Sequence, residues 1–271
     1  IRNSPMRIIT NNLRLFWQGT LLSYIALFVW LRPTTYIASK VLMPLAQILF
    51  FSFLGSYASG GTNVDFYVIG NAIQIVAVSG IFGVTLSIGG DRWNGTLPYL
   101  FGTPANRMML FFGRAFMHIF DGALGVVIAL GWGALLFGLD FSQTDLFALG
   151  ITILVTTIST CGLGLMMGCL SLITANVMFV NNTVYFLLLI FSGANIVLET
   201  FPNWMQIISQ MLPLTRGIAS ARLLISGSSL AEVTPLVLGE LGIGIIYGWL
   251  GFYLFKWVEN QAKRKGTLDL V

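Results

Sequence analysis

Long apolar runs, separated by short polar segments, fill most of the chain. A helix needs about 20 largely apolar residues to cross a membrane, because it rises about 1.5 Å per residue through a hydrocarbon core of about 30 Å. Six runs meet this requirement, and they occupy residues 36–57, 66–89, 108–138, 146–173, 178–199 and 236–257. The pattern therefore predicts an all-α integral membrane protein with six transmembrane helices.

A seventh apolar run, residues 13–31, has a different pattern in its first half. Asn11, Arg14 and Gln18 recur at helical spacing and share one face, with apolar residues on the other side. This arrangement is typical of an amphipathic helix that lies in the membrane interface. We expect the helix to end at Arg32-Pro33, since proline disfavours a helical conformation in the residue before it.

The distribution of lysine and arginine decides between six and seven spans. With six spans and both termini in the cytoplasm, 12 of the 14 basic residues are cytoplasmic, and only Arg216 and Arg222 lie outside. A seventh span gives 5 inside and 9 outside, or the reverse. Six spans fit best, because cytoplasmic segments are rich in these residues. We expect a cytoplasmic N-terminus and interfacial helix at 1–35, a transmembrane domain at 36–257 and a basic cytoplasmic tail at 258–271.

Composition supports a lipid environment. Hydrophobic residues make up 56% of the chain and charged residues only 9%, and the mean hydropathy is +0.85, whereas a soluble domain carries about a quarter charged residues. The net charge of +4 does not indicate a nucleic-acid partner, because the basic residues are spread between apolar runs rather than gathered on one face. Cys161 and Cys169 share one apolar run, so we expect free thiols and no metal site.

The segment 89–107, between the second and third runs, contains the sequence DRWNGTLPYLFGTP. This sequence resembles the cytoplasmic coupling segment of the ABC-2 type transporter permeases, where an acidic residue and an arginine precede Gly-Thr-Leu and a Thr-Pro or Ser-Pro follows. The matching residues are Asp91, Arg92, Gly95, Thr96, Leu97 and Pro104. The family often has glutamate at the first of these positions and a further acidic residue where this chain has Pro98. The alternative is an ordinary polar loop that satisfies two helix ends.

The resemblance implies the permease subunit of an ATP-driven exporter in a cell membrane, in keeping with a bacterial cytoplasmic membrane. It implies pairing with a second permease, for which we favour an identical copy, and docking of a separate ATPase subunit. The matched residues of the coupling segment would link that subunit to the spans. ATP and Mg²⁺ would be bound by the ATPase subunit, and the cargo would be a small amphipathic, lipid-linked or polymeric molecule.

Two further segments carry packing predictions. Residues 200–230 are too polar, and too interrupted by Pro202 and Pro213, to form a span. We expect two short re-entrant helices in the outer leaflet, as in the resembled family, with a simple capping hairpin as the alternative. In the fourth run, Gly164 and Gly168 are four residues apart, a spacing that lets helices approach closely, either within one chain or between subunits.

Polar residues inside the apolar runs are candidates for function. His118 and Asp121 share a helix face in the third run, and an ionisable residue in a membrane is a functional hypothesis by default. Proton coupling or substrate contact is one interpretation, and a position between packed helices or at the wet end of the helix is the other. Phe186, Phe191 and Asn195 on the fifth run could line a route for a lipid-like substrate, or could only pack and face lipid.

The chain contains no glycine-rich phosphate-binding loop ending in Gly-Lys-Ser or Gly-Lys-Thr, so we do not expect it to hydrolyse ATP itself. A polytopic membrane enzyme acting on lipid-linked substrates is the alternative. Such an enzyme needs a cluster of acids, bases or metal ligands at one depth. The single histidine and the scattered acids Asp121, Glu199 and Glu240 do not favour one. A passive channel is a third class, but no repeated charged or carbonyl filter is visible.

Overall fold

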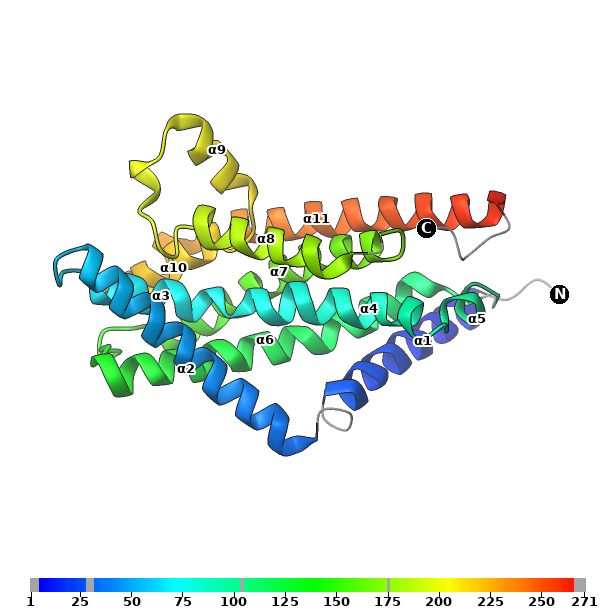
Figure 1. Ribbon diagram of the computed structural model, residues 1–271, viewed down its shortest axis with the longest axis horizontal. Coiled ribbons are helices and arrows are strands. Elements are labelled where there is room, and N and C mark those ends of the chain that lie inside the picture. Colours follow the sequence, from blue (N-terminus) through cyan, green and yellow to red (C-terminus); the bar gives the residue numbers. More distant parts are fainter. Residues whose placement is uncertain (1–4, 28–31, 103–104, 175, 266–271) are drawn as a thin grey trace.

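The computed structural model describes residues 5–27, 32–102, 105–174 and 176–265. All the regular secondary structure in these ranges is helical, and the long helices run roughly along one common axis (Figure 1). The N-terminus of α1 and the C-terminus of α11 lie at the same end of the bundle as the short helix α5. Helix α10 lies near the opposite end (Figure 1). We call these the α5 end and the α10 end. The all-α prediction is confirmed.

Five helical segments among the described residues are long and apolar enough to cross a membrane. They are α2 (Pro33–Ala58), the segment Val64–Arg92, α6 (Arg107–Phe137), α7 (Leu146–Ser171) and the part Leu230–Gln261 of α11 (Leu230–Lys265). The second segment consists of α3 (Val64–Gln74), a π-helical turn (Val78–Gly83) and α4 (Val84–Trp93). Each of the five contains or closely matches one of the predicted apolar runs.

The fifth predicted span, residues 178–199, is wrong as a continuous helix. Helix α8 covers only Val177–Phe191, 15 residues, or about 22 Å against a core of about 30 Å. The chain leaves the helix at Gly193, which has a φ of 79°, a left-handed conformation that glycine adopts at helix ends without steric cost. A short 3-10 turn at Leu198–Thr200 follows. Apolar composition alone does not show this break.

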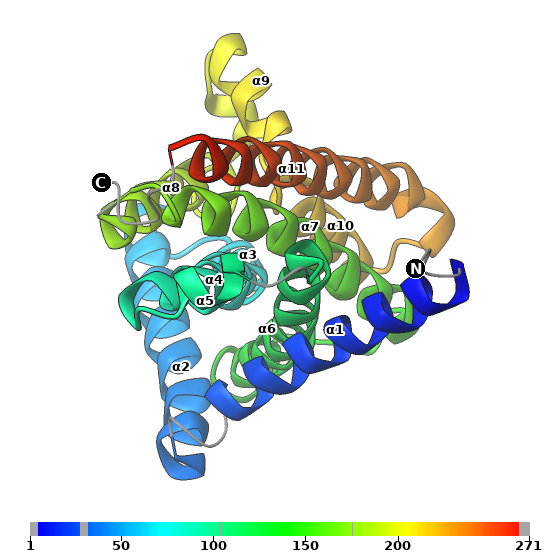
Figure 2. The ribbon, with the colours of Figure 1, turned by 90° about the vertical axis from the view of Figure 1, so that its right-hand side faces the viewer.

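Helix α1 (Pro5–Ile25) crosses the side of the bundle obliquely and packs on α6 (Figure 2). It has three faces. The polar face predicted from the sequence is exposed at Asn11, Arg14 and Gln18. A second exposed face is apolar and consists of Ile9, Leu13, Trp17 and Leu21, while Gly19, Thr20 and Ser23 are buried. A helix with one packed, one apolar and one polar face suits a boundary between lipid, water and protein.

Two glycines allow α1 and α6 to touch backbone to backbone. A Cβ atom on Gly19 would lie 2.2 Å from the carbonyl oxygen of Leu110, and one on Gly113 would lie 2.0 Å from that of Phe16. Thr20 donates a hydrogen bond to the carbonyl oxygen of Gly113 at 3.0 Å. No side chain larger than hydrogen fits either glycine position unless the two helices move apart.

Replacing Gly113 by alanine is therefore expected to destabilise the protein by about 1–3 kcal/mol through overpacking. The same substitution at Gly131 of α6, where a Cβ atom would meet nothing within 4 Å, should be neutral or stabilising, because alanine is the better helix former by about 1 kcal/mol. Thermal unfolding midpoints in one detergent compare the two variants. Equal shifts would contradict the close contact.

The α10 end contains the two short helices expected for residues 200–230, α9 (Asn203–Met211) and α10 (Thr215–Ile225). Helix α9 stands away from the bundle, while α10 packs into it (Figure 1). Glu240 of α11 is buried and accepts hydrogen bonds from the backbone N–H groups of Leu214, at 2.8 Å, and Gly217, at 3.3 Å. The carboxylate thus caps the start of α10, where unpaired N–H groups favour a negative charge.

The other side of α10 is held by Arg222. Its guanidinium donates to the carbonyl oxygens of Phe66, at 2.8 Å, and Ala194, at 3.1 Å. These contacts join α10 to the start of α3 and to the segment after α8. The close contact expected at Gly164 is also within the chain, because a Cβ atom there would lie 1.8 Å from the carbonyl oxygen of Gly80.

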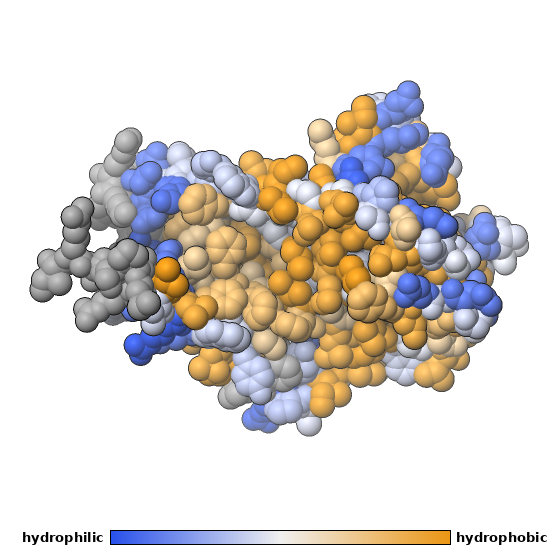
Figure 3. Space-filling view, turned by 180° about the vertical axis from the view of Figure 1, so that it is seen from behind, coloured by the Kyte–Doolittle hydropathy of each residue, from blue (hydrophilic) through white to orange (hydrophobic). Residues whose placement is uncertain are grey.

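The surface agrees with a membrane environment. A broad hydrophobic band crosses the middle of the molecule, with hydrophilic residues toward both ends (Figure 3). Elsewhere as well as on this face, large apolar side chains are exposed on α2, α6, α7, α8 and α11. Because monomeric soluble proteins rarely expose contiguous apolar patches of this extent, lipid is the natural solvent of the band.

Candidate functional site

The coupling segment predicted at 89–107 is a corner between two long helices. Helix α4 ends at Trp93, the six-residue helix α5 (Leu97–Gly102) follows, and α6 starts at Arg107. Gly95 has a φ of 66°, which lets the chain turn tightly between α4 and α5. The side chain of Asn106 accepts a hydrogen bond from the backbone N–H of Met109 and so caps α6.

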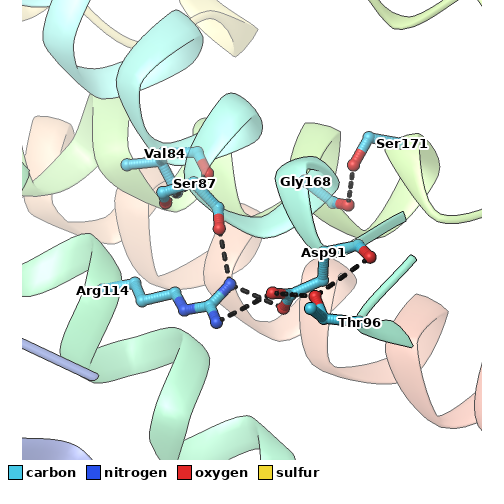
Figure 4. Close-up of polar contacts among 7 residues, drawn as sticks. All are labelled: Val84, Ser87, Asp91, Thr96, Arg114, Gly168 and Ser171. Carbon is cyan, nitrogen blue, oxygen red and sulfur yellow. Dashed lines mark hydrogen bonds and ion pairs between the residues drawn. The ribbon is translucent and has the colours of Figure 1, made fainter. Parts of the chain in front are cut away.

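Asp91 points into the bundle at this corner (Figure 4). Its two carboxylate oxygens accept hydrogen bonds from the guanidinium of Arg114 at 2.7 and 3.2 Å. The hydroxyl of Thr96 donates to the same carboxylate at 3.1 Å. Arg114 also donates to the carbonyl oxygen of Ser87 at 2.5 Å. A two-pronged arginine–carboxylate pair fixes orientation as well as distance, so it ties the end of α4 to α6.

Two more arginines tie the corner to other helices. Arg92 donates to the carbonyl oxygen of Thr174, in the connection between α7 and α8, at 2.9 Å. Arg107 forms an ion pair with Glu259 of α11 and donates from Nε to the carbonyl oxygen of Leu100 at 3.0 Å. The corner is therefore connected through polar contacts to α11 and to the α7–α8 connection, and α5 itself is held by the hydrogen bond from Arg107 to Leu100.

The apolar residues of α5 divide between the interior and the surface. Leu97 is only 5% exposed and belongs to a core cluster that includes Phe111, Phe255 and Val258. Tyr99 is 78% exposed, and Pro98 beside it is exposed as well. The most exposed large side chain on the outward surface of α5 is thus the aromatic ring of Tyr99.

The matched motif residues consequently differ in what they contact. Asp91, Arg92 and Leu97 contact the bundle, whereas Gly95 and Thr96 are exposed on the surface. Pro104 lies outside the described residues. The structure also brings in three residues that motif reading missed, namely Arg114, Glu259 and Tyr99. The signal for Arg114 was a charge within an apolar run, close enough in sequence to Asp91 to reach it.

The two intramembrane candidates, His118 and Asp121, are both buried, but the structure gives no hydrogen bond between them. Asp121 instead forms an ion pair with Lys40 of α2 at 2.6 Å. It also accepts hydrogen bonds from Tyr36 and Ser79, each at 2.5 Å. Three helical segments are therefore held together here by polar contacts, because the Asp121 carboxylate on α6 binds residues of α2 and of the π-helical turn.

Two details of this polar cluster add to the sequence-based interpretation. Lys40, which the charge count placed in the cytoplasm, lies between helices with its side chain only 15% exposed. His118 is buried beside Gly83 of the π-helical turn, and neither ring nitrogen has a hydrogen-bond partner among the described residues. The position between packed helices, considered as an alternative for this pair, is the one observed.

The three candidate pathway residues do not share one surface. Phe186 is exposed on the outside of α8, and the ring of Phe191 packs against that of Phe201 with centroids 5.9 Å apart. Asn195 turns toward α3, where its side-chain oxygen accepts a hydrogen bond from Asn71 at 2.8 Å. Cys161 and Cys169 are free, buried thiols. Among the described residues, no group of three or more His, Cys, Asp or Glu side chains could hold a metal ion.

Comparison with known families gives the membership of the chain. The family model described as ABC-2 type transporter matches residues 18–225. The chain belongs to the ABC-2 type transporter family. The matched range starts within α1 and ends with α10, so it includes α5 and both polar clusters. This ABC-2 protein is accordingly a membrane permease component of a transporter, of a family that generally works with a separate ATPase subunit. No curated protein matches the chain.

Proposed function

We propose that this permease exports its cargo with energy from a separate ATPase subunit, and that α5 is the element on which that subunit docks. The observation that carries the proposal is an exposed aromatic residue, Tyr99, on a short helix whose other contacts fasten it to the bundle. Aromatic side chains that fill a partner's pocket supply much of the binding energy of protein interfaces. Tyr99 would bind the ATPase subunit, and the buried motif residues would transmit the movement of that subunit to the transmembrane helices.

The contacts that hold α5 against the bundle suit the transmission of movement from the ATPase subunit to the transmembrane helices. A docking element that flexed independently would absorb the partner's displacement, whereas a fixed one passes it on. Asp91–Arg114 ties the corner to α6, and Arg107–Glu259 ties it to α11. We therefore assign Asp91, Arg92, Gly95, Thr96 and Leu97 a coupling role through support and turn geometry rather than through direct contact with the ATPase.

Orientation and assembly follow from the same proposal. The α5 end would face the cytoplasm, where ATP and Mg²⁺ are bound by the partner subunit, and both described chain ends lie at this end (Figure 1). A second copy of the permease would complete the pathway in a bacterial cytoplasmic membrane. The α10 end would then lie outside, with α9 and α10 at the exit. The cargo would be a small amphipathic, lipid-linked or polymeric molecule.

A membrane enzyme is a weaker interpretation, because the two buried acids already have separate structural partners and the third acid, Glu199, is exposed. Asp121 is bound to Lys40, and Glu240 caps α10. Glu199 lies in the 3-10 turn after α8. A reaction at a lipid-linked substrate needs acids and bases that converge on one point, and these three carboxylates belong to different parts of the fold.

Replacing Tyr99 by alanine is expected to weaken binding of the ATPase subunit about 30-fold, because a buried aromatic anchor contributes about 2 kcal/mol or more. The permease would be solubilised from native membranes in mild detergent, and co-purifying ATPase quantified. Tyr57→Ala is the matched control, because Tyr57 is 89% exposed at the far end of α2. Loss of the ATPase with both variants, or with neither, would contradict docking on α5.

A further inference from the structure

Four amide side chains on α2, α3 and α8, of which Gln47 is half-buried and the other three are buried, contain buried hydrogen-bonding atoms without a partner among the described residues. These atoms are Gln47 Nε2, Asn71 Oδ1, Gln74 Nε2 and both Oδ1 and Nδ2 of Asn181. In the part of the chain that the structure describes, every buried amide atom of this kind belongs to these three helices. Buried polar atoms are almost always hydrogen-bonded, so a group of unsatisfied ones requires an explanation.

The amides lie along one seam, where α8 and the residues just after it meet α2, α3 and the π-helical turn. At the outer part, Asn71 donates to Asn195 at 2.8 Å. Next, the hydroxyl of Ser192 donates to the side-chain oxygen of Gln74 at 3.0 Å. Asn71 thus uses its amide nitrogen and leaves its oxygen unpaired, whereas Gln74 uses its oxygen and leaves its amide nitrogen unpaired. The α3–α4 segment lies between α2 and α8 in both views of the ribbon (Figures 1 and 2).

The seam continues toward the α5 end along α8. The hydroxyl of Tyr185 donates to the side-chain oxygen of Gln47 at 3.3 Å and its ring packs on Phe82, with centroids 5.7 Å apart. Asn181, Tyr185 and Ser192 are spaced by four and seven residues, so they share one face of α8. From Asn181 to Ser192 this face extends about 16 Å, half the thickness of the hydrocarbon core.

The chemistry of the seam is uncharged. It presents amide and hydroxyl groups, while the buried charges nearby are used for other contacts. Asp121 and Lys40 neutralise each other, and Glu240 caps α10. A charged cargo would need an opposite charge to replace its water. Amide and hydroxyl groups instead satisfy the hydroxyl and amide groups of a neutral molecule.

We propose that this seam, between α8 and the segments α2, α3 and the π-helical turn, opens to form part of the cargo route. The cargo then has an uncharged, hydrogen-bonding headgroup, such as a sugar, on an apolar body. In the arrangement described here the seam is closed, since Gln74 and Asn181 are 0% exposed. Opening would expose Gln47, Gln74 and Asn181 as hydrogen-bond donors for the headgroup. The inference rests on the proposed transport function and adds the substrate class to it.

Buried amide groups without hydrogen-bond partners lower the free energy of unfolding. The first test of the proposal uses this effect. The paired changes Gln74→Met and Asn181→Leu keep the side-chain shape and remove three unpaired polar atoms at the loss of one hydrogen bond, from Ser192 to Gln74. If the amides serve cargo rather than folding, the unfolding midpoint should stay level or rise by about 2–4 °C. A fall of several degrees would mean that the amides hold the fold together, and would overturn the proposal.

The second test uses the complex of permease and ATPase subunit in lipid nanodiscs. Octyl glucoside, octyl sulfate and octyltrimethylammonium, below concentrations that disturb the disc, serve as neutral, anionic and cationic probes of ATP hydrolysis. We expect stimulation by octyl glucoside, and its ratio to the unstimulated rate should fall at least 5-fold in the double variant. Asn182→Leu is the matched control, because Asn182 is an exposed amide on the neighbouring face of α8.

The outcomes separate this inference from the proposed function. Stimulation only by a charged probe, no stimulation by octyl glucoside, or equal loss in Asn182→Leu would overturn the neutral-cargo seam while leaving ATP-driven transport intact. Failure of any ATPase subunit to co-purify with the unaltered chain would instead contradict the proposed function itself. Selective loss of octyl glucoside stimulation in the double variant, with stability maintained, supports the seam.

Discussion

Replacing Asp121 by alanine should prevent most of the protein from accumulating in folded form. The change leaves the Lys40 ammonium, now 2.6 Å from a carboxylate oxygen, without its counter-charge between helices. Removing one partner of a buried ion pair typically costs about 3–5 kcal/mol, which is a large part of the total stability of an ordinary protein. The measurement is the yield of monodisperse protein after extraction in mild detergent.

The double variant Asp121→Leu with Lys40→Met is the control for this result. It removes both charges and fills their space with apolar atoms, a replacement that is often neutral or stabilising. We expect its yield to return close to that of the unaltered chain. Poor yield of the double variant would show that the charges are not what makes the single variant fail. If the double variant folds but does not transport, the polar cluster has a role beyond structure.

Replacing Arg114 by methionine is expected to uncouple ATP hydrolysis from transport. Asp91 then loses the guanidinium that binds both of its oxygens, so α5 is less firmly joined to α6. Binding of the ATPase subunit should persist, because Tyr99 on the outer surface of α5 is unchanged. The amount of cargo moved per ATP hydrolysed should fall at least 10-fold, equivalent to about 1.4 kcal/mol of coupling free energy.

This second prediction is checked in proteoliposomes that contain the complex, by measuring transport and ATP hydrolysis in the same sample. Arg14→Met is the matched control, because Arg14 is an exposed arginine on the polar face of α1. A parallel fall of ATP hydrolysis and transport in the Arg114 variant would indicate loss of docking instead of uncoupling. An unchanged ratio would show that the arginine pair is not needed for transmission.

The positions of most long helices could be predicted from the sequence, because burial in lipid demands sustained apolar runs. The runs at 108–138 and 146–173 agree closely with α6 and α7. The run at 178–199 failed for a local reason that hydropathy does not register. Gly193 is compatible with an apolar run but adopts a positive φ, which ends α8 early.

Within the candidate site, the motif singled out residues 89–107 but could not show which way their side chains point. Asp91 and Arg92 are polar, and polarity favours a surface contact, yet both contact the bundle. Their partners are 23 and 82 residues away, so the pairing depends on how helices pack. Tyr99 had no distinguishing pattern within its segment, and only its exposure in the fold sets it apart.

The intramembrane cluster shows the same limit. His118 and Asp121 stand out because ionisable residues are rare in apolar runs, and both are indeed buried. The residue that pairs with Asp121 is Lys40, 81 positions earlier, and no local spacing connects them. The sequence therefore identifies unusual residues, while the tertiary structure determines their partners.

Helix α11 carries a glutamate near each end of the bundle. Glu259 pairs with Arg107, beside α5, and Glu240 holds the start of α10. The two glutamates are 19 residues apart within one unbroken helix, or about 28 Å, and Pro235 lies outside that interval. Because α11 is held at both positions, it cannot shift along its axis beside α5 unless its contact with α10 shifts too or one of the two glutamate contacts breaks. A displacement of α5 would therefore be passed to α10 directly through α11, without movement of a further helix between them.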